Sequence, residues 1–196
     1  MKKTPFKSPA KKLLLPKHPF WEFSMSVYSH PSVKEACLAL QNRFDMNVNV
    51  LLFCCWLAST GKGRLTKQEL QALLNIIDKW HRSITKSLRD VRYSLAAFSK
   101  IKLPLNKLRQ SILENELLAE QVEQLMLAGS ISKVSNDNLP PIKKLQDAIE
   151  SLKLLTEVAN KKLTEDDLVM FGQLLAGVFV NIPVSEVRSQ CRLFSQ

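Results

Sequence analysis

Charged side chains on an apolar helix face are the feature of this sequence with the clearest chemical meaning. Residues 105–127, laid out at 100° per residue, form one broad apolar face. The charged residues that fall inside this face are Glu116, Glu120, Glu123 and Arg109. An ionised carboxylate among apolar neighbours is costly unless it is paired, so these glutamates need cations close by.

The preceding helical stretch offers such cations. Its apolar stripe runs from Leu70 to Leu95, and the cationic side chains beside the stripe are His81, Arg82, Arg89 and Arg92. Pro104 interrupts the helical pattern, so we expect the two stretches to fold back on each other as an antiparallel hairpin. The sequence therefore predicts a buried or half-buried network of arginine and glutamate between the two helices.

Two interpretations of this network are open. In the structural one, which we favour, paired charges set the register of the helices at some cost in stability. In the functional one, a polar cleft binds a charged ligand through Arg89, Arg92, Glu116, Glu120, Glu123 and His81. A helical di-metal centre is typically built from Glu-x-x-His pairs, and the sequence has none. We interpret His81 as a half-buried packing residue and not as a metal ligand.

The remaining motifs predict no reaction. Residues 60–63 (Thr-Gly-Lys-Gly) lack the spacing of a phosphate-binding loop, and no strand pattern precedes them. The histidines are His18, His30 and His81, and none has an evident serine or cysteine nucleophile as its partner. We assign no catalytic residue, no metal and no cofactor, and the enzyme hypothesis stays open without support.

Positive charge is concentrated at the start of the chain. The formal net charge of the 196 residues is +10, and residues 1–20 contain no acidic side chain. The lysines of this segment are Lys2, Lys3, Lys7, Lys11, Lys12 and Lys17. Such a tail is either a solubilising leader or a contact for nucleic acid or the ribosome, to which Arg82 and Lys86 of the helical region would add.

Cysteine usage and the lengths of the apolar segments favour the cytoplasm. The cysteines form no Cys-x-x-Cys pair, so we expect them to be reduced core residues: Cys37, Cys54, Cys55 and Cys191. The apolar run Leu13–Leu15 is too short for a signal peptide. Residues 48–58 and 168–182 are apolar, but both segments are shorter than the roughly twenty residues of a membrane span.

Apolar residues recur at helical spacing, without the alternating runs typical of strands, which predicts an all-α fold. We expect a compact bundle of about six helices with a disordered basic N-terminal tail. The predicted parts are the tail at 1–19, a helical core domain with the long hairpin at 20–128, and C-terminal helices that pack on the same core at 129–196. Thr66 is predicted to cap a helix that continues to about Ser99.

Several aromatic, asparagine, arginine and glutamate elements occur in an order that resembles a known family. These elements are Phe20-Trp21 with Tyr28, Val48-Asn49-Val50-Leu51-Leu52 leading to Trp56-Leu57, Trp80 with Arg89 and Arg92, and Glu116-Leu117 with Glu120. They are similar to those of an uncharacterised proteobacterial family of small helical proteins, a domain of unknown function of about 150 residues. The resemblance covers residues 20–128 and implies a cytosolic bacterial helical protein without a known reaction.

Three functional hypotheses follow from these observations. The first is a non-catalytic module that binds a partner protein through a helical face or through the tail. The second is a nucleic-acid- or ribosome-associated protein, and the third is a small-ligand binder or enzyme that uses the Arg–Glu cleft. We prefer the first, because no reaction motif is present and the basic helix flank lacks interleaved aromatic residues for base stacking.

Overall fold

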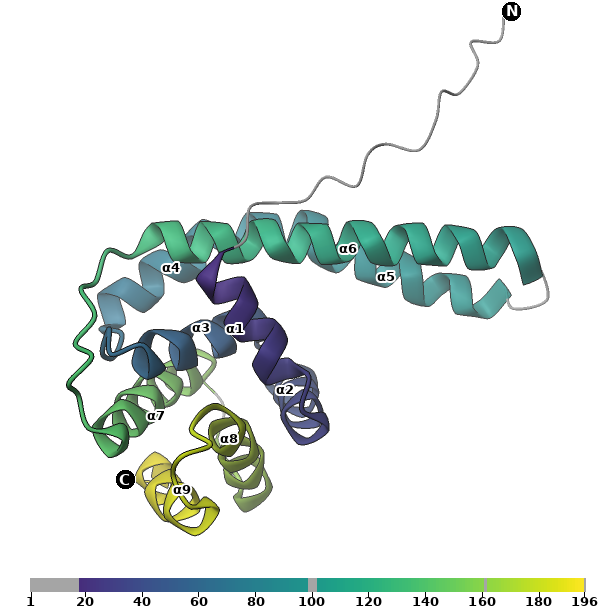
Figure 1. The fold of residues 1–196 in the computed structure, drawn as a ribbon. Coiled ribbons are helices and arrows are strands. Elements are labelled where there is room, and N and C mark those ends of the chain that lie inside the picture. Colours follow the sequence, from purple (N-terminus) through teal and green to yellow (C-terminus); the bar gives the residue numbers. More distant parts are fainter. Residues whose placement is uncertain (1–17, 99–101, 161, 196) are drawn as a thin grey trace, which may run out of the picture.

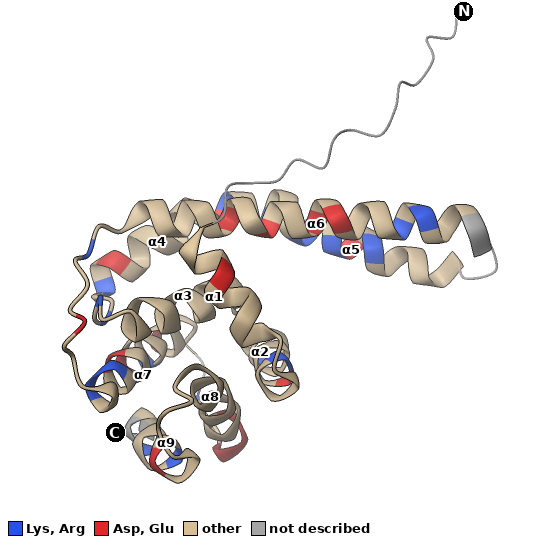
Figure 2. Ribbon diagram, viewed as in Figure 1, with Lys and Arg blue, Asp and Glu red and all other residues tan. Residues whose placement is uncertain are grey.

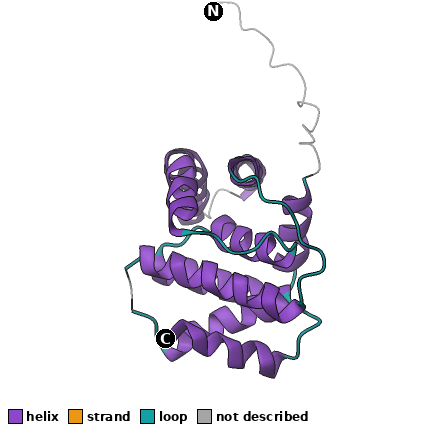
Figure 3. Ribbon diagram, turned by 90° about the vertical axis from the view of Figure 1, so that its left-hand side faces the viewer, coloured by secondary structure: helices purple, strands orange, loops and turns teal. Residues whose placement is uncertain are grey.

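The computed structural model describes residues 18–98, 102–160 and 162–195, and the regular structure in these ranges is helical throughout (Figure 3). The all-α prediction is therefore confirmed. The predicted count of about six helices is wrong, because short turns divide the described residues into more. The α-helices are α1 (Pro19–Tyr28), α2 (Pro31–Phe44), α3 (Val48–Ser59), α4 (Lys67–Trp80), α5 (Lys86–Ser94), α6 (Lys102–Ser130), α7 (Pro141–Val158), α8 (Glu165–Val178) and α9 (Val184–Cys191).

Two other predictions concern the N-terminal tail and membrane-spanning helices. The predicted tail lies almost entirely outside the described residues, and α1 already begins at Pro19. Within the described residues, no helix combines the length and apolar character that crossing a membrane requires.

Side-chain caps and prolines fix where the first helices begin. The ring nitrogen Nδ1 of His18 accepts a hydrogen bond of 3.1 Å from the backbone amide two residues on, and Pro19 opens α1. A proline is favourable there because the first amides of a helix have no intrahelical partner. Asn47 caps α3 by accepting a 2.8 Å hydrogen bond from the amide of Asn49. These signals explain why α1 and α3 start where they do.

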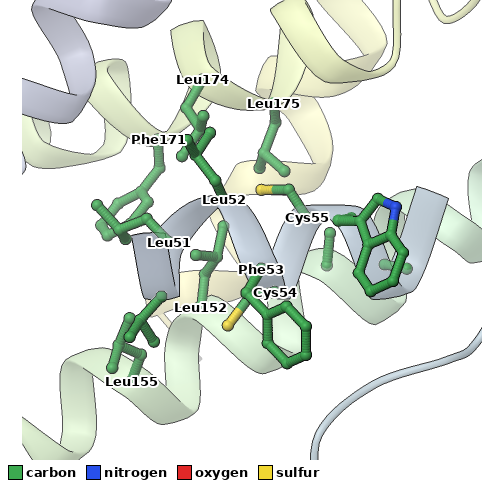
Figure 4. Packing of buried hydrophobic residues seen from close by; sticks show 14 of the residues in the cluster. Leu51, Leu52, Phe53, Cys54, Cys55, Leu152, Leu155, Phe171, Leu174 and Leu175 are labelled. Carbon is green, nitrogen blue, oxygen red and sulfur yellow. The ribbon is translucent and has the colours of Figure 1, made fainter. Parts of the chain in front are cut away.

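Helix α3 forms the centre of the molecule. Every residue from Asn49 to Ala58 is buried, which requires apolar side chains around the whole helix and not on one side only. Figure 4 shows the side chains of α7 and α8 that pack against α3: Leu152, Leu155, Phe171, Leu174 and Leu175. A single hydrophobic cluster thereby contains residues from Phe20 in α1 to Phe194 near the end of the chain.

The long helix predicted for residues 66–99 is helical but is not a single α-helix, which corrects that prediction. Its start is as expected, because Thr66 forms a capping box with Glu69. The chain then passes through α4, a π-helical turn η1 (His81–Thr85), α5 and a 3₁₀ turn η2 (Leu95–Phe98). In η1 the amide of Lys86 donates to the carbonyl of His81, so this turn contains one residue more than an α turn.

Helix α6 begins earlier than predicted. Pro104 was expected to break the chain before a helix starting at Leu105, but α6 starts at Lys102 and includes the proline in its first turn. The prediction is wrong because the amides of the first turn need no intrahelical acceptor, so a proline costs little there. Helix α6 then runs antiparallel to α5, since ion pairs join Arg89 to Glu120 and Arg92 to Glu116.

The segment between α6 and α7 is held against the turn that precedes α4. The amide of Asn136 donates to the carbonyl of Gly61 at 3.0 Å, and Lys133 Nζ lies 2.9 Å from a carboxylate oxygen of Glu69. Gly61 has a φ of +72°, and a Cβ at this position would lie 2.3 Å from the carbonyl oxygen of Asn136. Glycine is therefore required here, and the contact directs the chain toward α7 beside α3.

A two-helix arm projects from this body (Figure 1). We define the arm as residues 81–98 and 102–123, which comprise η1, α5, η2 and most of α6. Its two sides run next to each other beyond the ends of the other helices. No residue of α5 is buried, so the arm has little hydrophobic core of its own.

Candidate functional site

The arginines and glutamates that the sequence predicts to meet do lie together, between α5 and α6. Arg92 Nε is 2.5 Å from Glu116 Oε2, and Arg89 Nε is 2.9 Å from Glu116 Oε1. Arg89 Nη2 also lies 2.7 Å from Glu120 Oε1. Glu116 is only 3% exposed. These charge-assisted hydrogen bonds connect the two helices of the arm, because each arginine on α5 reaches a carboxylate on α6.

Burial and ion pairing shift the pKa values of Glu116 and Glu120 in opposite directions. Burial alone would raise the pKa of Glu116, but the hydrogen bonds from Arg92 and Arg89 outweigh it, and this pKa lies below its ordinary value. For Glu120 burial outweighs the attraction of Arg89, so its pKa lies above its ordinary value. Tyr28 of α1 lies close to this pair, and burial raises its pKa to about 12. The cluster is closed by its own ion pairs, a geometry that supports the structural interpretation.

Glu123 contacts other partners than the arginines predicted for it. Its side chain is 0% exposed, and it accepts a 3.1 Å hydrogen bond from the hydroxyl of Thr85. The amide nitrogen of Asn47 donates to the other carboxylate oxygen, and His81 Nδ1 lies 3.2 Å from Glu123 Oε2. The Asn47 amide cannot be flipped, because its oxygen already accepts from the backbone at the start of α3. Polar groups from η1 and from the start of α3 thus satisfy a carboxylate that water does not reach.

The same histidine and asparagine line a groove of about 780 Å³ beside α4. The apolar part of its lining comes from the α2–α3 turn, α3, α4 and the end of α7: Phe44, Met46, Val50, Leu74, Ile77, Leu155 and Val158. The side chain of His81 is 21% exposed, and Nε2 has no hydrogen-bond partner in the described part of the chain. Because π-helical turns occur often at functional sites, this groove is a second candidate site.

The basic residues proposed to contact nucleic acid are distributed differently from the prediction. Arg82 Nε lies 2.6 Å from Asp78, and Lys86 Nζ lies 3.8 Å from Asp45. Arg82 therefore does not pair with the glutamates of α6, which corrects its place in the predicted network. The residues of the tail, Lys2, Lys3, Lys7, Lys11 and Lys12, lie outside the described residues. Arg109 is exposed on α6.

Apolar side chains remain exposed along one face of the arm. Ile84 is 39% exposed, Val91 49% and Phe98 58%, and Leu108 on α6 is 49% exposed. From Ile84 in η1 through α5 to Phe98 in η2, the apolar residues recur at spacings of four and three, as in a coiled-coil seam. We call this surface the outer face, and its residues are Ile84, Ser87, Leu88, Val91, Ser94, Leu95, Phe98, Leu108, Ser111, Ile112 and Asn115. It faces away from α1, because Tyr28 lies near Arg89 and Glu120 on the other side of the arm.

The outer face carries no charged side chain, although α5 and α6 hold charges of both signs elsewhere (Figure 2). Ser87, Ser94 and Asn115 on this face each donate a side-chain hydrogen bond to a carbonyl of the preceding turn. The hydroxyl of Ser94 donates to the carbonyl of Asp90 at 2.9 Å, and the amide of Asn115 donates to the carbonyl of Ser111 at 2.7 Å. Covering this surface would leave these groups paired, so it would cost little in lost hydrogen bonds.

Asn47, Thr85 and Tyr28 are the polar residues around these clusters that the sequence analysis missed. A signal existed for Asn47, because an asparagine directly before an apolar helix is typical of a cap. Its second contact, with Glu123, joins residues far apart in the chain and leaves no local pattern. Thr85 was hidden inside a long helical pattern, since the sequence does not mark the π-helical turn.

Comparison with known proteins adds a family to this geometry. Residues 19–127 match the family model described as a protein of unknown function, DUF2390, and this segment is more than half of the chain. The chain belongs to the DUF2390 family. The DUF2390 segment contains α1 to α5 and nearly all of α6, and thus both polar clusters and the outer face. The resemblance to an uncharacterised family is confirmed. Searches of curated proteins and of solved structures gave no match.

Proposed function

We propose that the chain is a protein-interaction module whose docking surface is the outer face of the arm. One observation carries this proposal: α5, which has no buried residue, and the flanking turns η1 and η2 expose a heptad-spaced apolar stripe, of which Val91 and Phe98 are about half exposed. A helix normally buries its apolar stripe against another element. Here the arm extends past the body (Figure 1), and the ion pairs with α6 lie on the side of α5 that carries Arg89 and Arg92.

The chemistry of the outer face defines the kind of partner. Its spacing fits a helical partner, because apolar residues at heptad positions pack into the surface of a facing helix. Serines at positions 87, 94 and 111 are small and permit close approach of that helix. Since no charge lies on this face, the partner should present an equally uncharged apolar stripe, because an unpaired charge buried there would be costly.

Photo-cross-linking tests the docking surface directly. The full chain carries p-benzoylphenylalanine at position 98 on the outer face or, as the control, at position 93 on the opposite side of α5. Phe98 and Tyr93 are matched in exposure, at 58% and 59%. We expect a discrete covalent adduct from position 98 that Val91→Glu abolishes, and none from position 93. Equal adducts from both positions, or no adduct from position 98, would overturn the proposal.

A second candidate function, small-ligand binding, is favoured by the groove beside α4. Asn47 and Glu123 both lie within hydrogen-bond distance of His81 Nδ1, whereas Nε2 has no partner among the described residues and His81 contributes to the groove lining. Titration of the labelled full chain with a fragment library, followed by NMR, tests this candidate. Ligand binding predicts shifts confined to groove residues that Val158→Trp removes by filling the groove. Shifts that persist in that variant, or no shifts at all, would reject it.

A further inference from the structure

We infer that the partner of the outer face is a second copy of this chain, and that two arms associate antiparallel into a four-helix bundle. This inference rests on the proposed function and names its partner. A symmetric dimer brings one surface patch against the identical patch of the other copy, so the patch must be complementary to itself. Three features of the outer face fit this requirement: the spacing of its apolar residues, the absence of charged residues, and the two helices of the arm.

The apolar spacing along η1, α5 and η2 is nearly symmetric about Val91. Ile84 and Phe98 each lie seven residues from it, and Leu88 and Leu95 lie three and four residues from it. If a second α5 crosses antiparallel with the twofold axis at Val91, then Ile84 of each copy meets Phe98 of the other. Leu88 falls opposite Ser94 of the second copy, one residue from Leu95, so these two leucines are diagonal neighbours across the seam. Each apolar residue of the seam then lies opposite an apolar residue or within one residue of it, as coiled-coil packing requires.

The absence of charge on the outer face removes the main obstacle to self-association. The chain has a formal net charge of +10, so two copies repel each other wherever basic surfaces meet. The outer face is free of lysine and arginine, and contact through it brings no like charges together at the seam. A surface that selects a foreign protein typically uses complementary charges for that purpose, and none are present here.

The number of helices also fits a second copy. An arm of two helices whose α5 has no buried residue can supply half of a four-helix bundle, in which all four helices share one core. Two arms stacked through their outer faces complete such a bundle. The bodies then lie at opposite ends, because each arm points away from its own body (Figure 1). Their α1 helices stay clear of the contact, since α1 lies on the other side of the arm.

Disulfide trapping of the full chain tests this arrangement. Val91→Cys places one thiol of each copy at the twofold axis, where the two thiols are closer than at any other position of α5. Tyr93→Cys on the opposite side of the same helix and Val169→Cys on α8 are controls, and Val169 matches Val91 with 49% exposure. The natural cysteines, Cys37, Cys54, Cys55 and Cys191, are buried and do not interfere. We expect rapid, nearly complete cross-linking of Val91→Cys and little of either control.

Analytical ultracentrifugation of the same chain gives the independent readout. The unmodified chain should sediment as a dimer, and Val91→Glu should weaken the dimer by about a hundredfold or more, because it buries a charge at the seam. Val169→Glu should leave the dimer intact. A monomeric chain without trapping at position 91 overturns the inference. If position 98 still gives an adduct with another protein, only the identity of the partner is wrong; if it gives none, the proposed function fails as well.

Discussion

Glu116 and Glu120 occupy successive turns of α6, yet their surroundings affect them in opposite ways. Glu116 accepts hydrogen bonds from both Arg89 and Arg92, whereas Glu120 is paired with Arg89 only. A carboxyl whose pKa is lowered by folding stabilises the fold above its unfolded pKa of about 4.3, and this contribution is lost as the pH falls through the folded pKa. A carboxyl whose pKa is raised by folding has the opposite effect on stability, so its protonation favours the folded state.

The two glutamines that remove these charges should therefore behave differently. Glu116→Gln should destabilise the chain by ~2–3 kcal/mol at pH 7, because the partly buried Arg92 loses its paired carboxylate and Arg89 keeps only Glu120. The difference from the unmodified chain should begin to shrink as the pH falls below the unfolded pKa of about 4.3, and it should vanish as the pH passes through the lowered pKa of folded Glu116. Urea unfolding between pH 7 and pH 3 measures this effect.

Glu120→Gln is the matched control for this experiment. Its folded pKa is raised, so the ionised side chain already carries an unrecovered cost of burial. The substitution should cost little at pH 7, and the unmodified chain should gain stability relative to the variant as the pH falls. Equal losses from both substitutions at pH 7, with the same dependence on pH, would contradict this account of the arm.

Sequence reasoning at the scale of residues was strongest where helix faces decide contacts. The positions of Glu116 and Glu120 on an apolar face required cations, and the neighbouring arm helix supplied Arg89 and Arg92. It was correct only in part for Glu123: His81, one of the predicted partners, does contact it, but Asn47 and Thr85 take the place of an arginine. No sequence pattern distinguishes these two ways of satisfying a buried carboxylate.

At the scale of elements, close packing of α2 against α8 depends on one glycine. A Cβ at Gly177 would lie 2.2 Å from a methyl carbon of Val33, whose side chain is fully buried and cannot move away. Gly177→Ala should destabilise the chain by ~1–3 kcal/mol through overpacking. Gly129→Ala is the control, because nothing lies within 4 Å of a Cβ there and alanine favours the helix by ~0.5–1 kcal/mol. Thermal unfolding of both variants distinguishes crowding from helix propensity; destabilisation by Gly129→Ala, or none by Gly177→Ala, would refute it.

The helix starts were more predictable than the helix number. Local chemistry sets a start, as the capping boxes at Thr66 and Thr164 show. The number depends on where a helical stretch is interrupted, and η1 and η2 divide a stretch whose apolar spacing is continuous in the sequence. Pro104 was expected to break the helical pattern, but it lies inside α6, because a proline in the first turn does not end a helix.

At the scale of the whole molecule, the family segment does not complete its own core. Residues 19–127 include α3, but α7 and α8, which cover two of its sides, come from the remainder of the chain (Figure 4). A chain ending at Ser130 would expose Leu51, Leu52 and their neighbours to water. The division into a core domain at 20–128 and C-terminal helices at 129–196 therefore stays a prediction from the sequence. It does not imply that residues 20–128 fold on their own.

Truncation provides the corresponding test. Residues 1–130 should bind the dye ANS strongly and elute as a large aggregate, whereas the full chain should do neither, because exposed apolar surface of this extent drives association. Circular dichroism should still report helix in the truncated chain. A cooperative thermal transition of residues 1–130, at a temperature close to that of the full chain, would contradict this prediction.

The extra residue of the π-helical turn decides how body and arm are aligned. In an uninterrupted α-helix of the same length, everything after the turn would be rotated by about 100°, and Arg89 and Arg92 would swing away from α6. Deleting the exposed Ser83 should convert the turn to α geometry and leave both arginines facing Glu116. The loss should then fall on Glu123 and its partners alone. One additional residue thus lets the stretch from α4 to α5 provide partners both for Glu123 and for the pair Glu116 and Glu120. A chain that is one residue shorter at this turn can keep the same arm.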